Sequence, residues 1–391
     1  MTQGLKDRTA IVGIGLTPFA KKRDRSELSA GCEAIKMALD DAGLSPRDVD
    51  GMVRYEIETN TQEKYTRALG IENLRFYGSV EYGGGAGCGT ILHAATAVAI
   101  GAADVVVCLR SRNRGSGGRP WAKTANWVEG DWQFSAPYGL VRPVDQIGII
   151  ARRMMIEAGV KREYFGAAAI ACRTHAQRNP MALMRKPLTM EEYLGARMIA
   201  DPMCLFDCCL ESDGSLACVI TSAERARDLR QPPAYIHAAA QGMGPNASIM
   251  TNYYKADFLS TANTYVARDL WRHSDIRAAD IRCAQLYDAF TPRVVHDLIA
   301  YGFTTWDGIS EFIASDQITL GGRLPCNTAG GLISEGHLSG MGHVAEAVRQ
   351  VRGTSCNQVP DVRRSLVTGY GGAPHESPPT VAYSCAILSA P

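Results

Sequence analysis

Short apolar segments alternate with amphipathic ones along the chain. Residues 8–15 read as a buried strand that ends at glycine, and apolar residues then recur at helical spacing over 28–42 until Gly43 stops the pattern. Further strands are predicted over 51–54, 79–82 and 103–109, and a further helix over 90–100. This alternation of strands and helices favours a layered α/β fold.

The second half of the sequence repeats the order of the first. A strand is predicted over 234–240 and a helix over 265–272. Three further features occur twice: a capped turn (44–49 and 276–281), a glycine pair (83–84 and 330–331) and a helix (90–100 and 343–351). An internal duplication explains this correspondence better than one irregular domain does.

A segment of different composition separates the two halves. We expect residues 1–110 to form the first part of the N-terminal half, 111–201 an inserted loop domain, 202–230 the return of that half, and 231–391 the C-terminal half. The insertion holds helical patterns over 145–159 and 164–178, and it contains Trp121, Trp127 and Trp132. We expect it to cover one face of the first half and to contact substrate, or else to serve as a packing or oligomer arm.

Composition and charge narrow the function classes. Forty-one Lys and Arg oppose forty Asp and Glu, so the net charge is +1, which argues against nucleic-acid binding and against a polybasic membrane sensor. No apolar run reaches about 18 residues, so we expect no membrane span and a cytoplasmic protein. Among the twelve cysteines, only Cys204, Cys208 and Cys209 cluster, and their spacing matches no standard zinc site, so we expect no metal.

Five segments carry a family resemblance that extends over nearly the whole chain. They are the strand and loop 10–19, the helix–strand joint 42–50, Tyr-Asp-Ala-Phe-Thr at 287–291, the stretch from Asn327 to His337, and Gly-Tyr-Gly-Gly at 369–372. In this order they resemble the thiolase superfamily, close to its sterol-carrier-protein thiolase branch. The resemblance implies the thiolase fold: two duplicated βαβαβ-type halves in an α/β/α/β/α arrangement, with an inserted loop domain.

The chain departs from thiolases where a thiolase carries its nucleophile. A Claisen thiolase needs a thiolate that forms an acyl-enzyme. In the family this cysteine stands about twenty residues before the Ala-Asp that opens the next strand, and counting back from Asp104 reaches Gly84, which has no side chain. Cys88 follows four residues later, and a shift in register would restore a thiol there.

The other thiolase motifs are altered too. Tyr370 stands where thiolases have their second cysteine, and Tyr287 replaces the Asn or His of the third motif. His337 keeps the expected residue type but is followed by Leu338 instead of proline. Two lost cysteines with two gained tyrosines resemble the thiolase-like aldolases of steroid side-chain degradation, which the chain also resembles over 80–85 and 344–353.

This resemblance implies a carbon–carbon lyase that cleaves a β-hydroxyacyl-CoA by a retro-aldol reaction. The products would be a ketone or aldehyde and a shorter acyl-CoA, such as propionyl-CoA. Family members work with a small partner protein built on an OB-like domain and a zinc ribbon, and they pair through the strand at about 79–82. We therefore expect a homodimer, a heterotetramer with the partner, and no cofactor beyond the CoA of the substrate. Relatives can carry tyrosine at the position of His337, which leaves the acyl group open.

A retro-aldol step needs a base for the β-hydroxyl proton and donors for the charge that develops on the thioester oxygen. We expect Tyr287 and Tyr370 to act as the acid/base pair, in an order that the sequence leaves open, and neutral His337 to donate to the oxygen. Gly84 and Gly85 would allow close approach and supply backbone N–H groups, and Gly84 would leave room for a bulky β-carbon. Asp288 and Gly371 complete the expected vicinity.

Other interpretations stay open at this point. Each tyrosine, and His337, can be a buried structural residue, and His343 reads as a cap or packing residue. The chain can also be a Claisen thiolase that uses Cys88, or a non-catalytic scaffold that binds acyl-CoA. The CoA phosphates favour basic side chains, and the sequence does not choose among Arg110, Arg112, Arg114, Arg119, Lys123, Arg152 and Arg153.

Overall fold

The computed structural model describes residues 4–81, 83–117, 128, 133–245, 257, 259–372 and 381–391. The three tryptophans singled out above lie outside these ranges, as do Arg119 and Lys123.

The N-terminal half contributes five neighbouring strands. Their order in the sheet is β3 (Phe76–Val80), β2 (Gly51–Tyr55), β4 (Val105–Asn113), β7 (Asp213–Ser222) and β1 (Thr9–Leu16). Helix α1 (Glu27–Ala42) begins where the Ser26 side chain accepts the N–H of Ser29 and ends at Gly43, whose φ of 75° suits a residue without a Cβ. The helices α2 (Gln62–Leu69), α3 (Ala86–Ala99) and α7 (Ala223–Ala226) complete this half.

The C-terminal half repeats the same pairing, which confirms the predicted duplication. Its strands are β8 (Ala234–Gly242), β9 (Cys283–Gln285), β10 (Arg364–Gly372) and β11 (Val381–Ser389). The run β9–β10–β11–β8 has one parallel pair followed by two antiparallel pairs, as does β2–β4–β7–β1. Its helices are α8 (Ala262–Arg272), α9 (Thr291–Ala300), α10 (Ile309–Ala314), α11 (Gly331–Ser334) and α12 (Met341–Arg352).

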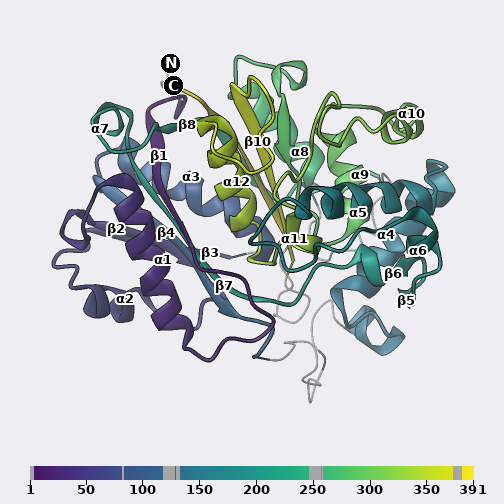
Figure 1. The fold of residues 1–391 in the computed structure, drawn as a ribbon, viewed down its shortest axis with the longest axis horizontal. Helices are drawn as coiled ribbons and strands as arrows, with labels where there is room; N and C mark the ends of the chain where they lie inside the picture. Colours follow the sequence, from purple (N-terminus) through teal and green to yellow (C-terminus); the bar gives the residue numbers. More distant parts are fainter. Residues whose placement is uncertain are drawn as a thin grey trace.

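Five layers result from the way the halves meet. Strands β1 and β8 pair through Ala10–Tyr235 and Ile11–Ala234, which joins the strands into one nine-stranded sheet. Helices α3 and α12 contact strands of both halves and form the middle layer, while α1 covers the outer side of one half and α8 that of the other (Figure 1). The expected α/β/α/β/α thiolase fold is confirmed, and its centre is where the two glycine-rich segments meet.

The inserted segment packs differently from the expectation. It contains α4 (Pro143–Glu157), α5 (Arg162–Ala176), α6 (Met190–Leu194) and the short strands β5 (Met198–Ala200) and β6 (Met203–Cys204). Helix α5 packs against α9, α10 and α11, so the insertion covers the C-terminal half (Figure 1). The expectation that it covers the first half is wrong, because its apolar side chains share a core with α9 and β11. Strand β4 also continues to Asn113, past the predicted boundary at residue 110.

No helix in the described ranges is long and apolar enough to cross a membrane.

Candidate active site

Tyr287 fills the space beside Gly84. It lies on the connection between β9 and α9, where its backbone N–H donates to the Thr368 hydroxyl at 2.9 Å. A Cβ at Gly84 would lie 1.9 Å from the Tyr287 phenol oxygen and 2.3 Å from the carbonyl oxygen of Tyr370. Because real Cβ atoms do not approach this closely, a side chain at residue 84 and the Tyr287 phenol exclude one another. The expectation that Gly84 leaves room for a substrate carbon is therefore wrong.

The surroundings of Tyr287 act on its acidity in opposite directions. The side chain is 4% exposed, and burial raises the pKa of the phenol above its ordinary value. Cys209 and Asp288 raise this pKa further, whereas the positive charges of Arg114 and Arg110 lower it. The phenol is therefore protonated at neutral pH in this structure, with two cations close enough to favour its deprotonation.

Tyr370 lies next to Tyr287 and belongs to a buried aromatic cluster. Its ring centroid is 6.2 Å from that of Tyr287 and 4.8 Å from that of Tyr383. The fully buried guanidinium of Arg293 lies 4.3 Å from the Tyr370 ring centroid and pairs with Asp297 at 3.6 Å. Burial raises the pKa of Tyr370 well above its usual range, and the Arg293 charge lowers it. Arg293 is thus a cation placed to stabilise a charged phenol, as the chemistry expected of Tyr370 requires.

His337 is held through its backbone and kept neutral. Its N–H donates to the Ser212 hydroxyl at 2.8 Å, and its side chain is 4% exposed. Burial lowers the pKa of the imidazole well below its usual value, and Arg114, Arg110 and His343 lower it further. His337 and Tyr287 thus lie within the electrostatic reach of the same two arginines, which brings these two predicted residues to one site.

Asp288 and His343 form a buried pair at the edge of this site. The His343 Nε2 is 2.9 Å from Asp288 Oδ1, which also accepts the N–H of Leu332 in the first turn of α11. A Cβ at Gly331 would lie 2.0 Å from Asp288 Oδ2, so glycine is required there. The His343 ring meets the Tyr287 ring edge-on, with centroids 6.3 Å apart. Asp288 therefore fixes the glycine turn, and His343 is more than the packing residue that its sequence position suggested.

The predicted glycines mark a close crossing of chain segments. Gly84 and Gly85 lie in a single turn of 3-10 helix at residues 83–85, and the Ser384 hydroxyl donates to the carbonyl of Gly85. A Cβ at Gly369 would lie 3.0 Å from the Gly84 carbonyl oxygen. Gly371 follows Tyr370 in strand β10, where it is buried. The segment at 83–85 and strand β10 can approach this closely only because both are rich in glycine.

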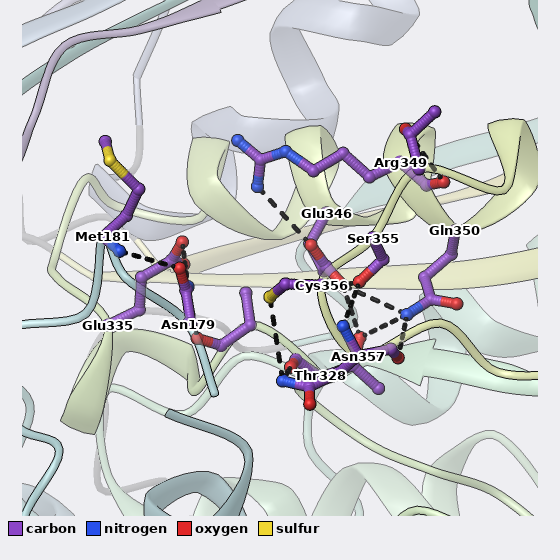
Figure 2. A network of polar contacts seen from close by, with 12 residues as sticks. Asn179, Met181, Thr328, Glu335, Glu346, Arg349, Gln350, Ser355, Cys356 and Asn357 are labelled. Atoms are coloured by element: carbon purple, nitrogen blue, oxygen red, sulfur yellow. Dashed lines mark hydrogen bonds and ion pairs between the residues drawn. The ribbon is translucent and has the colours of Figure 1, made fainter. Parts of the chain in front are cut away.

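A second polar network supports the loop that carries His337 (Figure 2). The Asn179 side chain donates to the carbonyl of Ala329 at 2.8 Å and to Glu335 Oε1 at 3.1 Å, so it ties both ends of the turn to the end of α5. On α12, the Glu346 carboxylate accepts hydrogen bonds from Thr328, Gln350 and Ser355. Side chains of the insertion and of α12 therefore hold the part of the loop that precedes His337.

Cys88 is a core residue. Its side chain is 1% exposed and its thiol donates to the carbonyl of Val367 at 3.6 Å. Burial raises the pKa of the thiol well above its usual value, which is the opposite of what a nucleophilic cysteine needs. The position of Cys88 therefore argues against the thiolase interpretation.

Most candidate arginines of the insertion have partners in the protein. Arg110 is buried and pairs with Glu58 at 2.8 Å, so it is not available to a phosphate. The other pairs are Arg112 with Glu27, Arg152 with Asp201 and Arg153 with Glu157. In the described part of the chain, no group of three His, Cys, Asp or Glu residues could hold a metal ion.

The sequence reasoning missed Arg293 and Tyr55 and took His343, a third residue of the site, for a cap or packing residue. Arg293 is the third residue of α9 and follows Tyr287 by six residues, and nothing in the local sequence marks it as buried. His343 and Tyr55 reach the site only through contacts with residues 55 and 284 positions away in the chain. Only the spacing of His337 and His343 in one glycine-rich stretch offered a signal.

Comparisons with known proteins give the same assignment as the motifs. The family described as "Thiolase C-terminal domain-like" matches residues 225–382. The "17-hydroxy-3-oxo-4-pregnene-20-carboxyl-CoA lyase" of Mycobacterium tuberculosis is 46% identical over 378 residues, covering 95% of this chain and 98% of the relative. The "Steroid side-chain-cleaving aldolase" of Thermomonospora curvata is 44% identical and covers 95% of this chain and 97% of its own.

Solved structures agree with this relationship. The "Ltp2-ChsH2(DUF35) aldolase" superposes with a TM-score of 0.92 at 44% identity, covering 99% of this chain and 98% of the other. A monomeric SCP2-thiolase-like protein from Mycobacterium smegmatis has a TM-score of 0.74 at 23% identity, which speaks for the fold alone. The chain belongs to the thiolase superfamily and, within it, to the thiolase-like acyl-CoA lyases that cleave steroid side chains.

Proposed function

We propose that the site cleaves a β-hydroxyacyl-CoA with a steroid side chain by a retro-aldol reaction. One observation carries the mechanism: the Tyr287 phenol lies where a side chain at residue 84 would have to be. A tyrosine in place of a nucleophilic thiol can move a proton but leaves no acyl group on the protein. The names of the two relatives with 46% and 44% identity support the substrate class.

The proposed step balances without a covalent intermediate. A base takes the β-hydroxyl proton, the Cα–Cβ bond breaks to give the ketone or aldehyde, and its electron pair becomes the enolate of the shorter thioester. A proton delivered to the α-carbon then completes the shorter acyl-CoA. The CoA arrives with the substrate, so we propose that no further cofactor takes part.

Each predicted residue has a place in this scheme. Tyr287 is one member of the acid/base pair: burial keeps its phenol protonated, and the positive charges of Arg114 and Arg110 stabilise the phenolate that must form before it can accept the β-hydroxyl proton. Neutral His337 donates to the thioester oxygen as the enolate forms. Tyr370, with Arg293 against its ring, is the second phenol of the acid/base pair, and its ring centroid lies 6.2 Å from that of Tyr287. Gly84, Gly85, Asp288 and Gly371 allow the close approach of the segments that carry these side chains.

The assembly is also a proposal. The similar structure named Ltp2-ChsH2(DUF35) aldolase supports a small partner subunit for this chain, and the thiolase resemblance supports a homodimer, so we propose a heterotetramer. Because its substrate is a CoA thioester, we propose that the enzyme works in the cytoplasm.

The test is to incubate the protein, with such a partner, with a steroid β-hydroxyacyl-CoA and to follow both products by mass spectrometry. The unchanged enzyme should release a ketone or aldehyde and a shorter acyl-CoA. Tyr287→Phe should lower kcat by about 10²–10⁴-fold, the usual contribution of a positioned acid/base. His337→Ala should lower it by about 10²-fold through loss of one oxyanion donor.

Tyr65→Phe is the matched control, since it removes another buried phenol oxygen in the N-terminal half. Its kcat should equal that of the unchanged enzyme. An acyl group trapped on Cys88 in the intact mass, or full activity of Tyr287→Phe, would contradict the proposed mechanism.

A further inference from the structure

A buried ion pair lies next to the site, and its only part in the reaction described so far is the charge of Arg110 near Tyr287. Arg110 Nη1 lies 2.8 Å from Glu58 Oε1, and the two side chains are 3% and 0% exposed. Glu58 Oε1 also accepts the backbone N–H of Ser111 at 2.9 Å. A buried ion pair adds little net stability compared with apolar residues of the same size, so its retention calls for another explanation.

Tyr55 connects this pair to the catalytic loop. The Arg110 guanidinium lies 5.0 Å from the centroid of the Tyr55 ring, and the fully buried Tyr55 hydroxyl donates to the carbonyl of Ser339 at 2.9 Å. A Cβ at Gly87 would lie 3.3 Å from that hydroxyl and 3.1 Å from the carbonyl carbon of Gly340. The Tyr55 hydroxyl is therefore enclosed between the first turn of α3 and the turn at 339–340.

That turn lies beside Tyr287 and directly follows the segment that carries His337. Ser339 has a φ of 49° and Gly340 a φ of 90°, a left-handed conformation that serine adopts only when its surroundings hold it. The turn follows His337 by two residues, and a Cβ at Gly340 would lie 3.5 Å from the Tyr287 ring and 3.1 Å from the Gly84 carbonyl oxygen. A shift of this turn would therefore move His337 and Tyr287 relative to each other.

We propose that Tyr55, held in place by the Glu58–Arg110 ion pair, is a positioning residue that fixes the turn at 339–340 and with it the geometry between His337 and Tyr287. The catalytic consequence rests on the function proposed above, whereas the structural consequence does not. Arg110 also acts on the site through its charge, which lowers the pKa of both Tyr287 and His337.

The first experiment needs no substrate. Tyr55→Phe removes a single hydroxyl, and the backbone amides of residues 336–343 should then exchange with deuterium about tenfold faster, the effect of losing one buried hydrogen bond. Tyr193→Phe is the matched control: it also loses a buried, bonded hydroxyl, which donates to Asp207 at 2.6 Å, and it should leave exchange at 336–343 unchanged. Equal exchange in the Tyr55→Phe variant and the unchanged protein would overturn the proposal.

The second experiment measures catalysis on the same variants with the partner present. Tyr55→Phe should lower kcat about tenfold with KM within about twofold, because geometry and not substrate binding is disturbed. Arg110→Lys keeps the charge beside Glu58 and should retain more activity than the paired change Glu58→Gln with Arg110→Met. Adding Tyr55→Phe to that paired change should cost little more, since the three residues act as one unit.

These results separate the two proposals. An unchanged enzyme that cleaves nothing contradicts the proposed function, while faster exchange at 336–343 still supports the positioning role. Active Tyr55→Phe with unchanged kcat contradicts the positioning role and leaves the lyase function intact.

Discussion

At the scale of single residues, the main feature of the site is that the Tyr287 phenol occupies the volume of a side chain at residue 84. Thiolases need a side chain at the position of Gly84, and here the Tyr287 phenol occupies that volume. The absence of a nucleophile and the presence of the phenol are therefore one structural fact, not two independent substitutions. This explains why a tyrosine at residue 287 and a glycine at residue 84 occur together in this chain.

Gly84→Ala should consequently cost far more activity than a methyl group suggests. The new Cβ would displace the Tyr287 phenol by more than 1 Å, and misplacement of that size costs about 10²-fold in kcat. Gly148→Ala in α4 is the control, because its Cβ would lie no closer than 3.4 Å to any neighbour. Steady-state kinetics of both variants, with circular dichroism to establish folding, give the answer; a fully active Gly84→Ala would show that the phenol is dispensable.

At the scale of elements, the turn that carries His337 depends on three supports. Asp288 caps α11 at its start, Tyr55 holds the carbonyl of Ser339 at its end, and Asn179 bonds Glu335 in between. Glu335 is fully enclosed beside Glu346 and Arg349 (Figure 2). Burial raises the pKa of Glu335 from 4.5 to about 8, so this carboxyl is largely protonated at neutral pH.

The raised pKa of Glu335 predicts how stability depends on pH. Between pH 4.5 and about 8 the unfolded chain has released this proton while the folded protein holds it, so the free energy of unfolding falls as pH rises through that window. Glu335→Gln keeps an acceptor for Asn179 and removes the titration. Its melting temperature should match that of the unchanged protein near pH 4.5 and exceed it by about 2–4 °C at pH 8.

Thermal unfolding across this pH range is the measurement. Glu63→Gln on α2 serves as the control because it removes an exposed carboxyl. If the melting temperatures of Glu335→Gln and the unchanged protein differ by the same amount at every pH from 4.5 to 8, Glu335 does not titrate with a raised pKa.

At the scale of the whole molecule, the two duplicated halves meet over a shared pair of helices in one nine-stranded sheet, and β3 is one of the two end strands of that sheet. Along β3, Tyr77 is 63% exposed and Ser79 is also exposed. Open strand edges pair readily with a second chain. This edge is the one at which the thiolase resemblance places the homodimer.

We therefore expect the purified chain of 42.2 kDa to sediment as a dimer. Tyr77→Asp should shift it toward monomer, because two like charges would face each other across a twofold axis. Tyr138→Asp is the control, as this tyrosine is 78% exposed at a distance from β3 in the chain. Analytical ultracentrifugation distinguishes the outcomes, and a Tyr77→Asp protein that remains dimeric would place the interface elsewhere.

Local patterns predicted the elements well because their causes are local. The helix that ends at Gly43 and the turns at 44–49 and 276–281 depend on caps and glycines within a few residues. The chemistry at Tyr287, Tyr370 and His337 was anticipated from motifs, and the structure brings all three into one region. Their roles stay predictions that the variants above test.

The sequence by itself determined the duplicated α/β order and the residue types of the site, because strand and helix patterns and short motifs depend on residues close together in the chain. Its resemblance to thiolases identified Gly84 as the position without a thiol. Only the tertiary structure decided that the Tyr287 phenol fills the space beside Gly84, that the insertion covers the C-terminal half, and that Tyr55, with Arg110 against its ring, bonds the turn at 339–340. Those facts depend on contacts between segments tens to hundreds of residues apart, and the volume that two side chains compete for exists only once the halves have packed together.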